Sequence, residues 1–198
     1  MKLGIGSYAY AWALGVPGYM PDTPMSALDF VRRASALGVS LVQIADNIPL
    51  VSMDAAELDA LENEVKRLNM AVEVGARGVQ PENVRAHLEL AKRFKSPILR
   101  AVVDAAGFEP EPAEIIAILR GLMPAFAEAG IVLAIENHDR FKARTVADIV
   151  EGVGGDYIGV CLDTVNSFGS LEGPEVVVDT LGPFVVNLHV KDFWIRRH

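Results

Sequence analysis

Short apolar segments alternate with longer amphipathic segments along the whole chain. Seven segments are rich in Val, Ile and Leu, and their apolar residues mostly follow one another without alternation, as expected of strands buried on both faces of a parallel sheet. These predicted strands are residues 3–7, 41–45, 70–74, 98–103, 131–135, 158–162 and 184–190. Because no two of them are joined by a hairpin turn signal, the pattern predicts a parallel α/β sheet.

Between the predicted strands, apolar residues recur at helical spacing. The predicted helices are residues 25–37, 55–68, 81–94, 112–129, 145–152 and 174–181. Ser52 or Asp54 is placed to cap the second of them. His87 lies among charged residues in the third, so we expect it on the surface.

The rhythm of the elements and the length of the chain favour a closed barrel over an open doubly wound sheet. From the third predicted strand onward, strands start about every 27 to 30 residues. An eight-unit barrel typically needs ~250 residues, and this chain has 198. We therefore expect an α/β fold, a (β/α)8 TIM barrel in which residues 1–198 form a single domain. The eighth strand-helix unit is expected to be missing because the chain is C-terminally incomplete.

Composition and charge narrow the range of partners. The formal net charge is -8, whereas nucleic-acid binders usually present a basic face, so we expect no nucleic-acid partner. The single cysteine, Cys161, rules out an internal disulfide and fits a reducing compartment. Neither a signal-peptide pattern nor an apolar run long enough for a membrane helix is present. The sequence therefore predicts a cytoplasmic protein without a membrane partner.

A match to a nucleotide-binding pattern near the N-terminus is set aside. Residues 4–9 fit G-x-G-x-x-G/A, but the pattern needs a full strand before it and a helix that starts within it. Only three residues precede Gly4, and residues 12–18 are expected to form a loop. We predict no dinucleotide cofactor and expect the glycines to allow close approach of neighbouring strands.

Three late strands each lead into a side chain that can bind a metal ion. Glu136, Asp163 and His189 follow apolar strands and are separated by about 27 and 26 residues, one strand-helix unit each. In a parallel barrel this spacing places all three at the carboxyl-terminal rim, where barrel enzymes keep their catalytic groups. Two carboxylates and one imidazole suit a divalent metal; Mn²⁺ is expected first, and Mg²⁺, Co²⁺ or Zn²⁺ also fit.

The segments AIENHD, GVCLDTVN and LHVKD, which contain these three residues, resemble signature segments of the xylose isomerase-like sugar phosphate isomerase/epimerase family. The resemblance implies that Glu136, Asp163 and His189 hold the metal together with a final glutamate on the eighth strand. That glutamate has no counterpart in this sequence. In such enzymes the two glutamates often act as an acid/base pair across the substrate.

The resemblance implies a metal-dependent isomerase or epimerase of a ketose or sugar phosphate. We expect Glu136 to remove the proton beside the carbonyl, giving a metal-bound cis-enediolate. One alternative is a metal-dependent dehydratase of an inosose or dehydroshikimate on the same barrel. Another is a degenerate barrel that binds a sugar without turning it over. The resemblance also allows a homodimer.

Five further residues are candidates for binding substrate, namely His138, Lys191, Asn166, Trp12 and Arg100. The resemblance implies that His138 or its neighbour Asn137 contacts substrate oxygens or the metal shell. Lys191 is placed either to bind a phosphate or enediolate oxygen, or to pair with Asp192. Arg100 lies inside a predicted buried strand and needs a partner, so an ion pair with Glu73 is the alternative to substrate binding.

Overall fold

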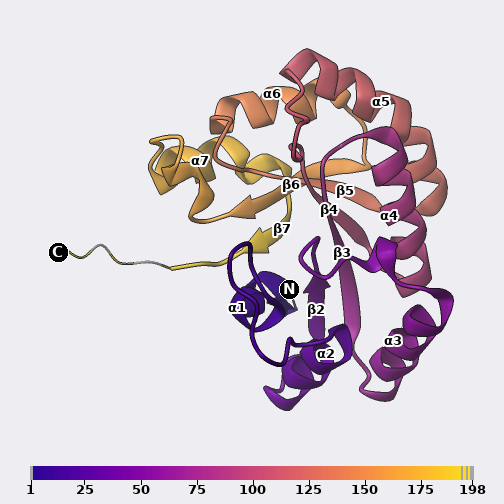
Figure 1. Ribbon diagram of the computed structural model, residues 1–198. Coiled ribbons are helices and arrows are strands. Elements are labelled where there is room, and N and C mark those ends of the chain that lie inside the picture. Colours follow the sequence, from indigo (N-terminus) through magenta and orange to yellow (C-terminus); the bar gives the residue numbers. More distant parts are fainter. Residues whose placement is uncertain (1, 193, 195, 197–198) are drawn as a thin grey trace. The chain divides into compact units, whose positions relative to one another are not determined.

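A computed structural model describes residues 2–192, 194 and 196. These residues divide into two compact units. The first unit runs to Ala76 and also includes Glu82–Leu99, and the second comprises Arg77–Pro81 and the chain from Arg100 onward. Strands and helices alternate along both units in the predicted order (Figure 1).

The first unit is built on three parallel strands. The strands are β1 (Ile5–Gly6), β2 (Leu41–Ile44) and β3 (Ala71–Arg77, with Arg77 counted in the second unit), and β2 pairs with both of the others. The helices are η1 (Ser7–Tyr10), α1 (Ala11–Leu14), α2 (Ala27–Ala36), η2 (Leu50–Ser52), α3 (Ala55–Arg67) and α4 (Pro81–Phe94). A β-carbon on Gly4 would come within 2.9 Å of the Leu41 main-chain oxygen. Gly4 therefore allows the chain before β1 to approach β2 closely.

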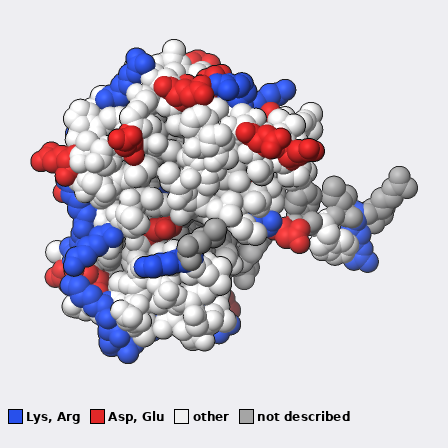
Figure 2. Space-filling model, turned by 180° about the vertical axis from the view of Figure 1, so that it is seen from behind, with Lys and Arg blue, Asp and Glu red and all other residues white. Residues whose placement is uncertain are grey.

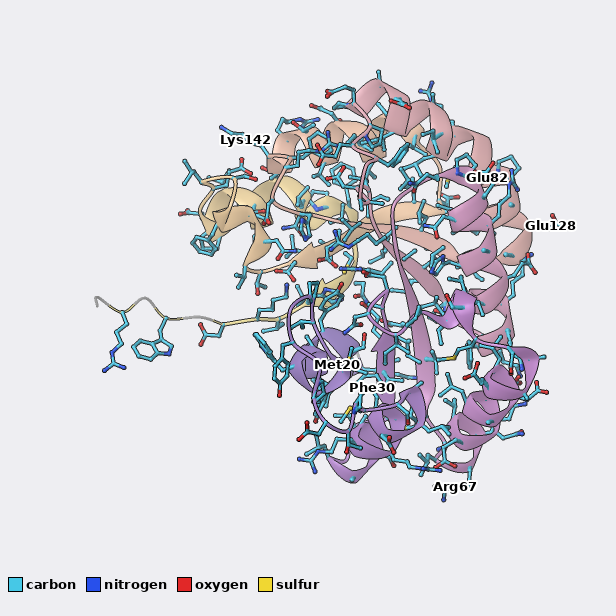
Figure 3. The ribbon with its side chains drawn as sticks, viewed as in Figure 1. Met20, Phe30, Arg67, Glu82, Glu128 and Lys142 are labelled. Carbon is cyan, nitrogen blue, oxygen red and sulfur yellow. The ribbon has the colours of Figure 1, made fainter. Side chains whose placement is uncertain are left out.

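Capping and burial explain why the helices of the first unit start and pack as they do. Asp54 and Glu57 form a capping box at the start of α3, with hydrogen bonds of 2.8 and 2.9 Å. Phe30 on α2 is fully buried, whereas Arg67 at the end of α3 holds its guanidinium on the Glu64 carboxylate (Figure 3). The expectation of a loop over residues 12–18 is partly wrong, because the first of these residues belong to α1. A four-residue helix is too short to show a periodic pattern.

His87 is buried, contrary to the surface position expected from its charged neighbours. Its ring lies on α4, is only 6 % exposed, and has Nδ1 2.9 Å from the main-chain oxygen of Asn83. Val84, Leu88 and Ala91 are buried on the same helix. Spacings of three and four residues therefore place His87 on the apolar face of α4.

We expect His87 to make folding stability pH-dependent. Burial lowers the pKa of His87 below its ordinary value of 6.5, so the unfolded chain takes up this proton more readily than the folded chain. The contribution of the buried neutral imidazole to the free energy of unfolding is complete above pH 6.5 and is lost as the pH falls through the lowered pKa. Urea midpoints at about pH 7.5 and about pH 5 should differ less in a His87→Gln variant than in the wild type. An equal difference in both proteins would contradict this assignment.

The second unit carries the later strands and three covering helices. The strands are β4 (Ile98–Val102, shared with the first unit), β5 (Val132–Glu136), β6 (Ile158–Asp163) and β7 (Val185–His189). β6 pairs in parallel with both β5 and β7. The helices are α5 (Pro112–Ala129), α6 (Ala143–Val153), η3 (Asn166–Phe168), α7 (Pro174–Leu181) and η4 (Gly182–Phe184). α5, α6 and α7 pack in succession on the outer side of these strands (Figure 1).

A glycine and a bulge set how β7 lies against β6. A β-carbon on Gly159 would come within 2.9 Å of the Phe184 main-chain oxygen and 2.7 Å of Val186 Cγ1. The register shifts by one residue on β7, so that Val160 lies opposite Val185 but Cys161 lies opposite Asn187. The extra residue brings Asn187 level with Cys161 and His189 level with Asp163.

Replacing Gly159 with alanine is expected to destabilise the protein by about 1–3 kcal/mol, because the main chain at Phe184, just before β7, and the Val186 side chain must move to admit the methyl group. The matched control is Gly121→Ala on the exposed side of α5, where a β-carbon meets nothing within 4 Å. The free energy of unfolding of that variant should rise by about 0.5–1 kcal/mol, because alanine has a higher helix propensity than glycine. Urea denaturation measures both changes, and an unchanged midpoint for Gly159→Ala would show that β7 can give way freely.

No helix in the described part of the chain is long and apolar enough to cross a membrane. The face shown in Figure 2 carries both acidic and basic side chains and much uncharged surface. A cytoplasmic location, a homodimer and the absence of a nucleic-acid partner stay predictions from the sequence.

Candidate metal and sugar site

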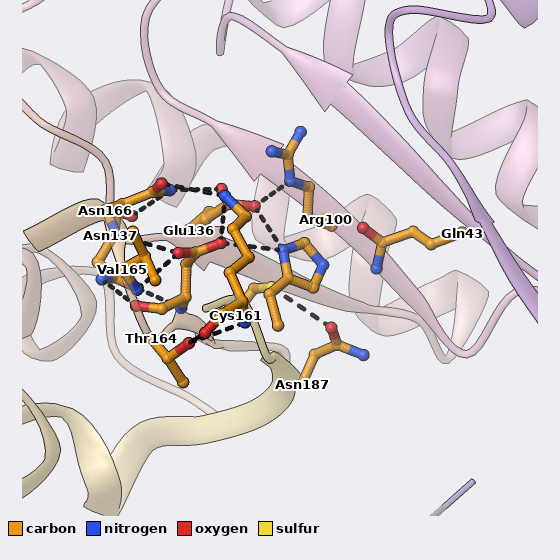
Figure 4. A network of polar contacts seen from close by, with 12 residues as sticks. Gln43, Arg100, Glu136, Asn137, Cys161, Thr164, Val165, Asn166 and Asn187 are labelled. Carbon is orange, nitrogen blue, oxygen red and sulfur yellow. Dashed lines mark hydrogen bonds and ion pairs between the residues drawn. The ribbon is translucent and has the colours of Figure 1, made fainter. Parts of the chain in front are cut away.

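Three strand ends of the second unit bring Glu136, Asp163 and His189 together. Each is the last residue of its strand, on β5, β6 and β7 respectively. His189 Nδ1 is 3.2 Å from Glu136 Oε2 and 3.7 Å from Asp163 Oδ2 (Figure 4). Both carboxylates are buried, and about a fifth of the His189 side chain is exposed. The imidazole therefore reaches two buried carboxylates at once.

The two oxygens of Asp163 have different partners. Oδ1 accepts hydrogen bonds from the main-chain N–H groups of Val165 and Asn166, at 2.9 and 3.0 Å. This local turn is one that aspartate forms readily after a strand. Oδ2 faces His189 and receives an ion pair from Lys191 Nζ at 2.6 Å. Only Oδ2 is therefore turned towards the cluster.

Glu136 is held by one partner on each oxygen besides His189. Arg100 on β4 donates from Nε to Oε2, and Asn166 donates from Nδ2 to Oε1 at 2.9 Å. Arg100 is almost fully buried. Glu136 is a partner of Arg100 that the sequence did not suggest. The expected ion pair between Arg100 and Glu73 stays a prediction; Glu73, in the first unit, accepts a hydrogen bond of 3.0 Å from Gln43.

The close charges shift the protonation of all three residues. Burial raises the pKa of Glu136, but the His189 hydrogen bond and the Arg100 charge outweigh it and hold the pKa at about 2. Burial likewise opposes ionisation of Asp163, but contacts with His189 and Lys191 place its pKa well below the usual range. Burial lowers the pKa of His189, whereas Asp163, Cys161 and Glu136 together raise it to about 11. In this state His189 is an imidazolium between two carboxylates.

Lys191 and Asn166 join the same cluster. Lys191 Nζ is 3.1 Å from Asn166 Oδ1 as well as 2.6 Å from Asp163 Oδ2. Thr164 anchors the lysine main chain, because Thr164 Oγ1 accepts from the Lys191 N–H at 3.0 Å and donates to the Lys191 main-chain oxygen at 3.2 Å. About half of the lysine side chain remains exposed. Three of the five substrate-binding candidates thus contact the carboxylates directly, namely Arg100, Lys191 and Asn166.

The other two substrate-binding candidates have different contacts. His138 lies on the loop after β5, with Nδ1 3.8 Å from Asp139 Oδ2. Trp12 belongs to the first unit, where its ring packs edge-to-face on Tyr19 at 5.5 Å and is 69 % exposed. Their roles in binding substrate stay predictions.

A family model described as "Xylose isomerase-like TIM barrel" matches residues 9–198. The chain belongs to that family. The barrel fold expected from the sequence is therefore confirmed, and seven strands of the barrel lie in the described residues.

The proteins to which the chain is similar carry different activities in their names. The chain is 28 % identical to 3-oxo-isoapionate decarboxylase of Pectobacterium atrosepticum over 197 residues, covering all of this chain and 70 % of that protein. A crystal structure of D-psicose 3-epimerase in the presence of D-fructose matches with a TM-score of 0.76 and 16 % identity, over 96 % of this chain and 72 % of that one. The probable 3-DHS dehydratase AsbF from Bacillus anthracis matches with a TM-score of 0.70 and 15 % identity, over the same shares of both chains.

The distances in the cluster can be compared with those around a divalent cation. Ligand atoms that share one ion at about 2.1 Å lie roughly 3.0–3.4 Å apart. The separations of 3.2 and 3.7 Å from His189 Nδ1 are close to that range. Carboxylate oxygens with one imidazole nitrogen form a donor set typical of Mn²⁺, Mg²⁺, Co²⁺ or Zn²⁺. Glu136 Oε2 and His189 Nδ1 are thus close enough to share an ion, and Asp163 Oδ2 lies 3.7 Å from the same nitrogen.

Cys161 offers a fourth atom near this set. Its sulfur lies with ligand atoms of Glu136 and His189 in a group whose members are all within 4.8 Å of one another. Burial raises the pKa of this thiol, and its sulfur is 3.3 Å from Asn187 Oδ1. A protonated thiol is a weak ligand, and Asp163 as a third ligand stays a prediction from the sequence.

Two polar side chains beside the site have roles that the sequence did not show. Asn137 and Ser167 are both buried and hydrogen-bonded to each other at 2.9 Å. The sequence suggested that Asn137 or His138 would contact substrate oxygens or the metal shell, but every polar atom of the Asn137 side chain is engaged by protein groups. An asparagine straight after a strand is a weak signal, because the same residue is common in turns.

Proposed function

We propose that this chain is a divalent-metal-dependent isomerase or epimerase that removes a proton beside the carbonyl of a ketose or sugar phosphate. The observation that carries the proposal is the convergence of Glu136, Asp163 and His189 at three neighbouring strand ends. Barrel enzymes place catalytic groups at this rim. Membership of the family and the match to an epimerase structure support the same activity.

The three residues would hold the ion, which supplies Lewis acidity that stabilises negative charge on the substrate's carbonyl oxygen. Asp163 contributes Oδ2, since main-chain N–H groups already occupy Oδ1. His189 contributes Nδ1 and must give up its proton to do so, because a metal ligand is a neutral imidazole. Mn²⁺ is our first expectation among the four ions that this donor set suits.

Glu136 is the proposed base. In the metal-free arrangement its pKa of about 2 makes it a weak base. A divalent ion held by this carboxylate would keep its pKa low, but it would also stabilise negative charge on the carbonyl oxygen and so make the neighbouring C–H group acidic enough for a weak base. The carboxylate then takes the proton from the carbon, and the electron pair of the broken C–H bond moves towards the carbonyl oxygen. Return of a proton to the opposite face gives an epimer and needs a second acid across the substrate, the role that the family resemblance implies for a glutamate on an eighth strand. Return of the proton from Glu136 to the neighbouring carbon gives an isomer.

The remaining candidates would bind the substrate. Lys191 is half exposed, and its ammonium group would exchange its contacts with Asp163 and Asn166 for a phosphate or an oxyanion of the substrate. Asn166 lies between Lys191 and Glu136 and can offer its amide to a hydroxyl group. Arg100 would hold Glu136 in place, and Trp12 and His138 would contact the sugar.

Decarboxylation of a 3-oxo sugar acid is the second candidate function. The specific observation is that the whole chain aligns with a decarboxylase at 28 % identity, against 15–16 % for the epimerase and dehydratase structures. In this reaction a C–C bond breaks, CO₂ leaves, and the electron pair moves into the neighbouring carbonyl just as it does after proton removal. The same ligands serve both reactions, but decarboxylation needs a proton donor in place of a base. The donor set is also compatible with a dehydratase and with a barrel that binds a sugar without turning it over.

Solvent deuterium exchange tests the proposed step even while the product is unidentified. The protein with Mn²⁺ is incubated in D₂O with D-fructose and other ketoses, with ketose phosphates and with 3-oxo sugar acids. Mass spectrometry follows deuterium at the carbon beside the carbonyl. Deuterium uptake together with an epimeric or isomeric sugar supports the proposal. Release of CO₂ from 3-oxo sugar acids without exchange into ketoses favours the decarboxylase, and loss of water favours the dehydratase. Ligand binding without any reaction supports the non-catalytic barrel.

A further inference from the structure

We infer that Asn137 is a positioning residue that sets the distance between Glu136 and Asp163 by continuing the β5–β6 ladder with its side chain. This inference rests on the proposed metal site. β5 ends at Glu136, whose partner on β6 is Cys161. β6 continues for two more residues to Asp163, beyond the end of its neighbour.

The Asn137 side chain takes the place of the missing main chain. Its Oδ1 accepts from the Asp163 N–H at 2.7 Å, and its Nδ2 donates to the Asp163 main-chain oxygen at 2.9 Å. A peptide group of a neighbouring strand forms the same two kinds of hydrogen bond. The amide therefore ties the main chain of Asp163 to the residue directly after Glu136.

Burial makes these bonds strong determinants of geometry. Asn137 is fully buried, and Ser167, which accepts the second Nδ2 hydrogen at 2.9 Å, is almost fully buried. A buried polar group that loses its partner costs about 1–3 kcal/mol, so this arrangement resists displacement. Three hydrogen bonds thus fix the Asn137 amide in one orientation, with Asp163 on one side and η3 on the other.

Asn166 forms a second tie next to the first. Its Nδ2 donates to the Asn137 main-chain oxygen at 3.1 Å as well as to Glu136 Oε1. Its own N–H is one of the two that hold Asp163 Oδ1. Asn166 therefore holds one oxygen of each carboxylate, while Asn137 holds the main chain of Asp163. Glu136 Oε2 and Asp163 Oδ2 remain directed at His189.

Cobalt binding to the 198-residue chain tests this role, because the visible spectrum of Co²⁺ reports ligand geometry without any need for turnover. We compare the wild type with the variants Asn137→Ala and Asn137→Asp. The aspartate variant keeps the size of the side chain and the Oδ1 acceptor but loses the amide donor. Both variants should bind Co²⁺ about 10–100-fold more weakly, as is usual when a group that orients metal ligands is removed. Their Co²⁺ absorption bands should also shift in position or intensity.

The matched control is Ser170→Ala. Ser170 also bridges the loops after β5 and β6, with Oγ donating to the Asp139 main-chain oxygen at 2.6 Å, but it touches none of the ligands. This variant should keep the wild-type affinity and spectrum. Circular dichroism and a thermal scan show whether each variant is folded, and Asn137→Asp keeps the test available if Asn137→Ala does not fold.

The outcomes separate the inference from the function on which it rests. Wild-type affinity and spectrum in a folded Asn137 variant would overturn the positioning role while leaving the metal site intact. Equal weakening in Ser170→Ala would also overturn it, because any bridge between the loops would then suffice. Failure of the wild type itself to bind Co²⁺ would overturn the proposed metal site, and the positioning role with it.

Discussion

An Asp163→Ala variant is expected to lose the divalent metal that the wild type retains after dialysis. Asp163 supplies one of three ligand groups, and its Oδ2 also holds Lys191 beside the site. Removing it leaves two ligands and frees a lysine charge that repels a cation. Elemental analysis should give roughly one ion per wild-type chain and less than about a tenth of that in the variant, because a structured site is needed for tight binding.

Asp156→Ala is the matched control for this experiment. Asp156 is exposed and precedes β6, so it lies at the opposite end of the strand that ends in Asp163. Its removal makes the same change in net charge without touching the cluster. Metal content that falls equally in both variants would point to non-specific binding by an acidic surface. Metal retained in Asp163→Ala would show that Asp163 is not a ligand.

A Glu136→Gln variant is expected to lose the exchange of solvent deuterium into substrate. Glutamine keeps the shape of the side chain but cannot take up a proton, and a positioned general base typically contributes about 10²–10⁴-fold to the rate. The rate of deuterium uptake should fall by that factor in any ketose that the wild type labels. Because Arg100 donates to Glu136, thermal stability is measured alongside to separate loss of catalysis from loss of fold.

Glu128→Gln provides the control for a change from carboxylate to amide. Glu128 is exposed on α5, away from any ligand (Figure 3). The Glu128→Gln variant should exchange solvent deuterium into substrate at the wild-type rate. Wild-type exchange in Glu136→Gln would refute the role of Glu136 as the base.

The sequence by itself determined the elements and their order. Runs such as residues 158–162 contain enough consecutive apolar residues to predict a strand buried on both faces, and the structure places β6 at Ile158–Asp163. It also singled out Glu136, Asp163 and His189, because strand ends that recur at one strand-helix interval must meet at one rim of a parallel barrel. Strand periodicity and repeat length are local properties, so one sequence is sufficient to show them.

Only the tertiary structure decided which polar groups hold the site together. That Arg100 pairs with Glu136, and that the Asn137 amide binds the main chain of Asp163, depends on contacts between residues 26 to 36 positions apart. The one-residue bulge on β7 that brings His189 level with Asp163 is likewise invisible in an apolar run. Side-chain hydrogen bonds do not recur with a period along the chain, so no sequence pattern predicts them. An asparagine in a turn and an asparagine whose side chain bonds to the main chain of a neighbouring strand look identical in the sequence. The sequence therefore specified where the ligands meet, and packing between β4, β5, β6 and β7 within the second unit specified how they are held.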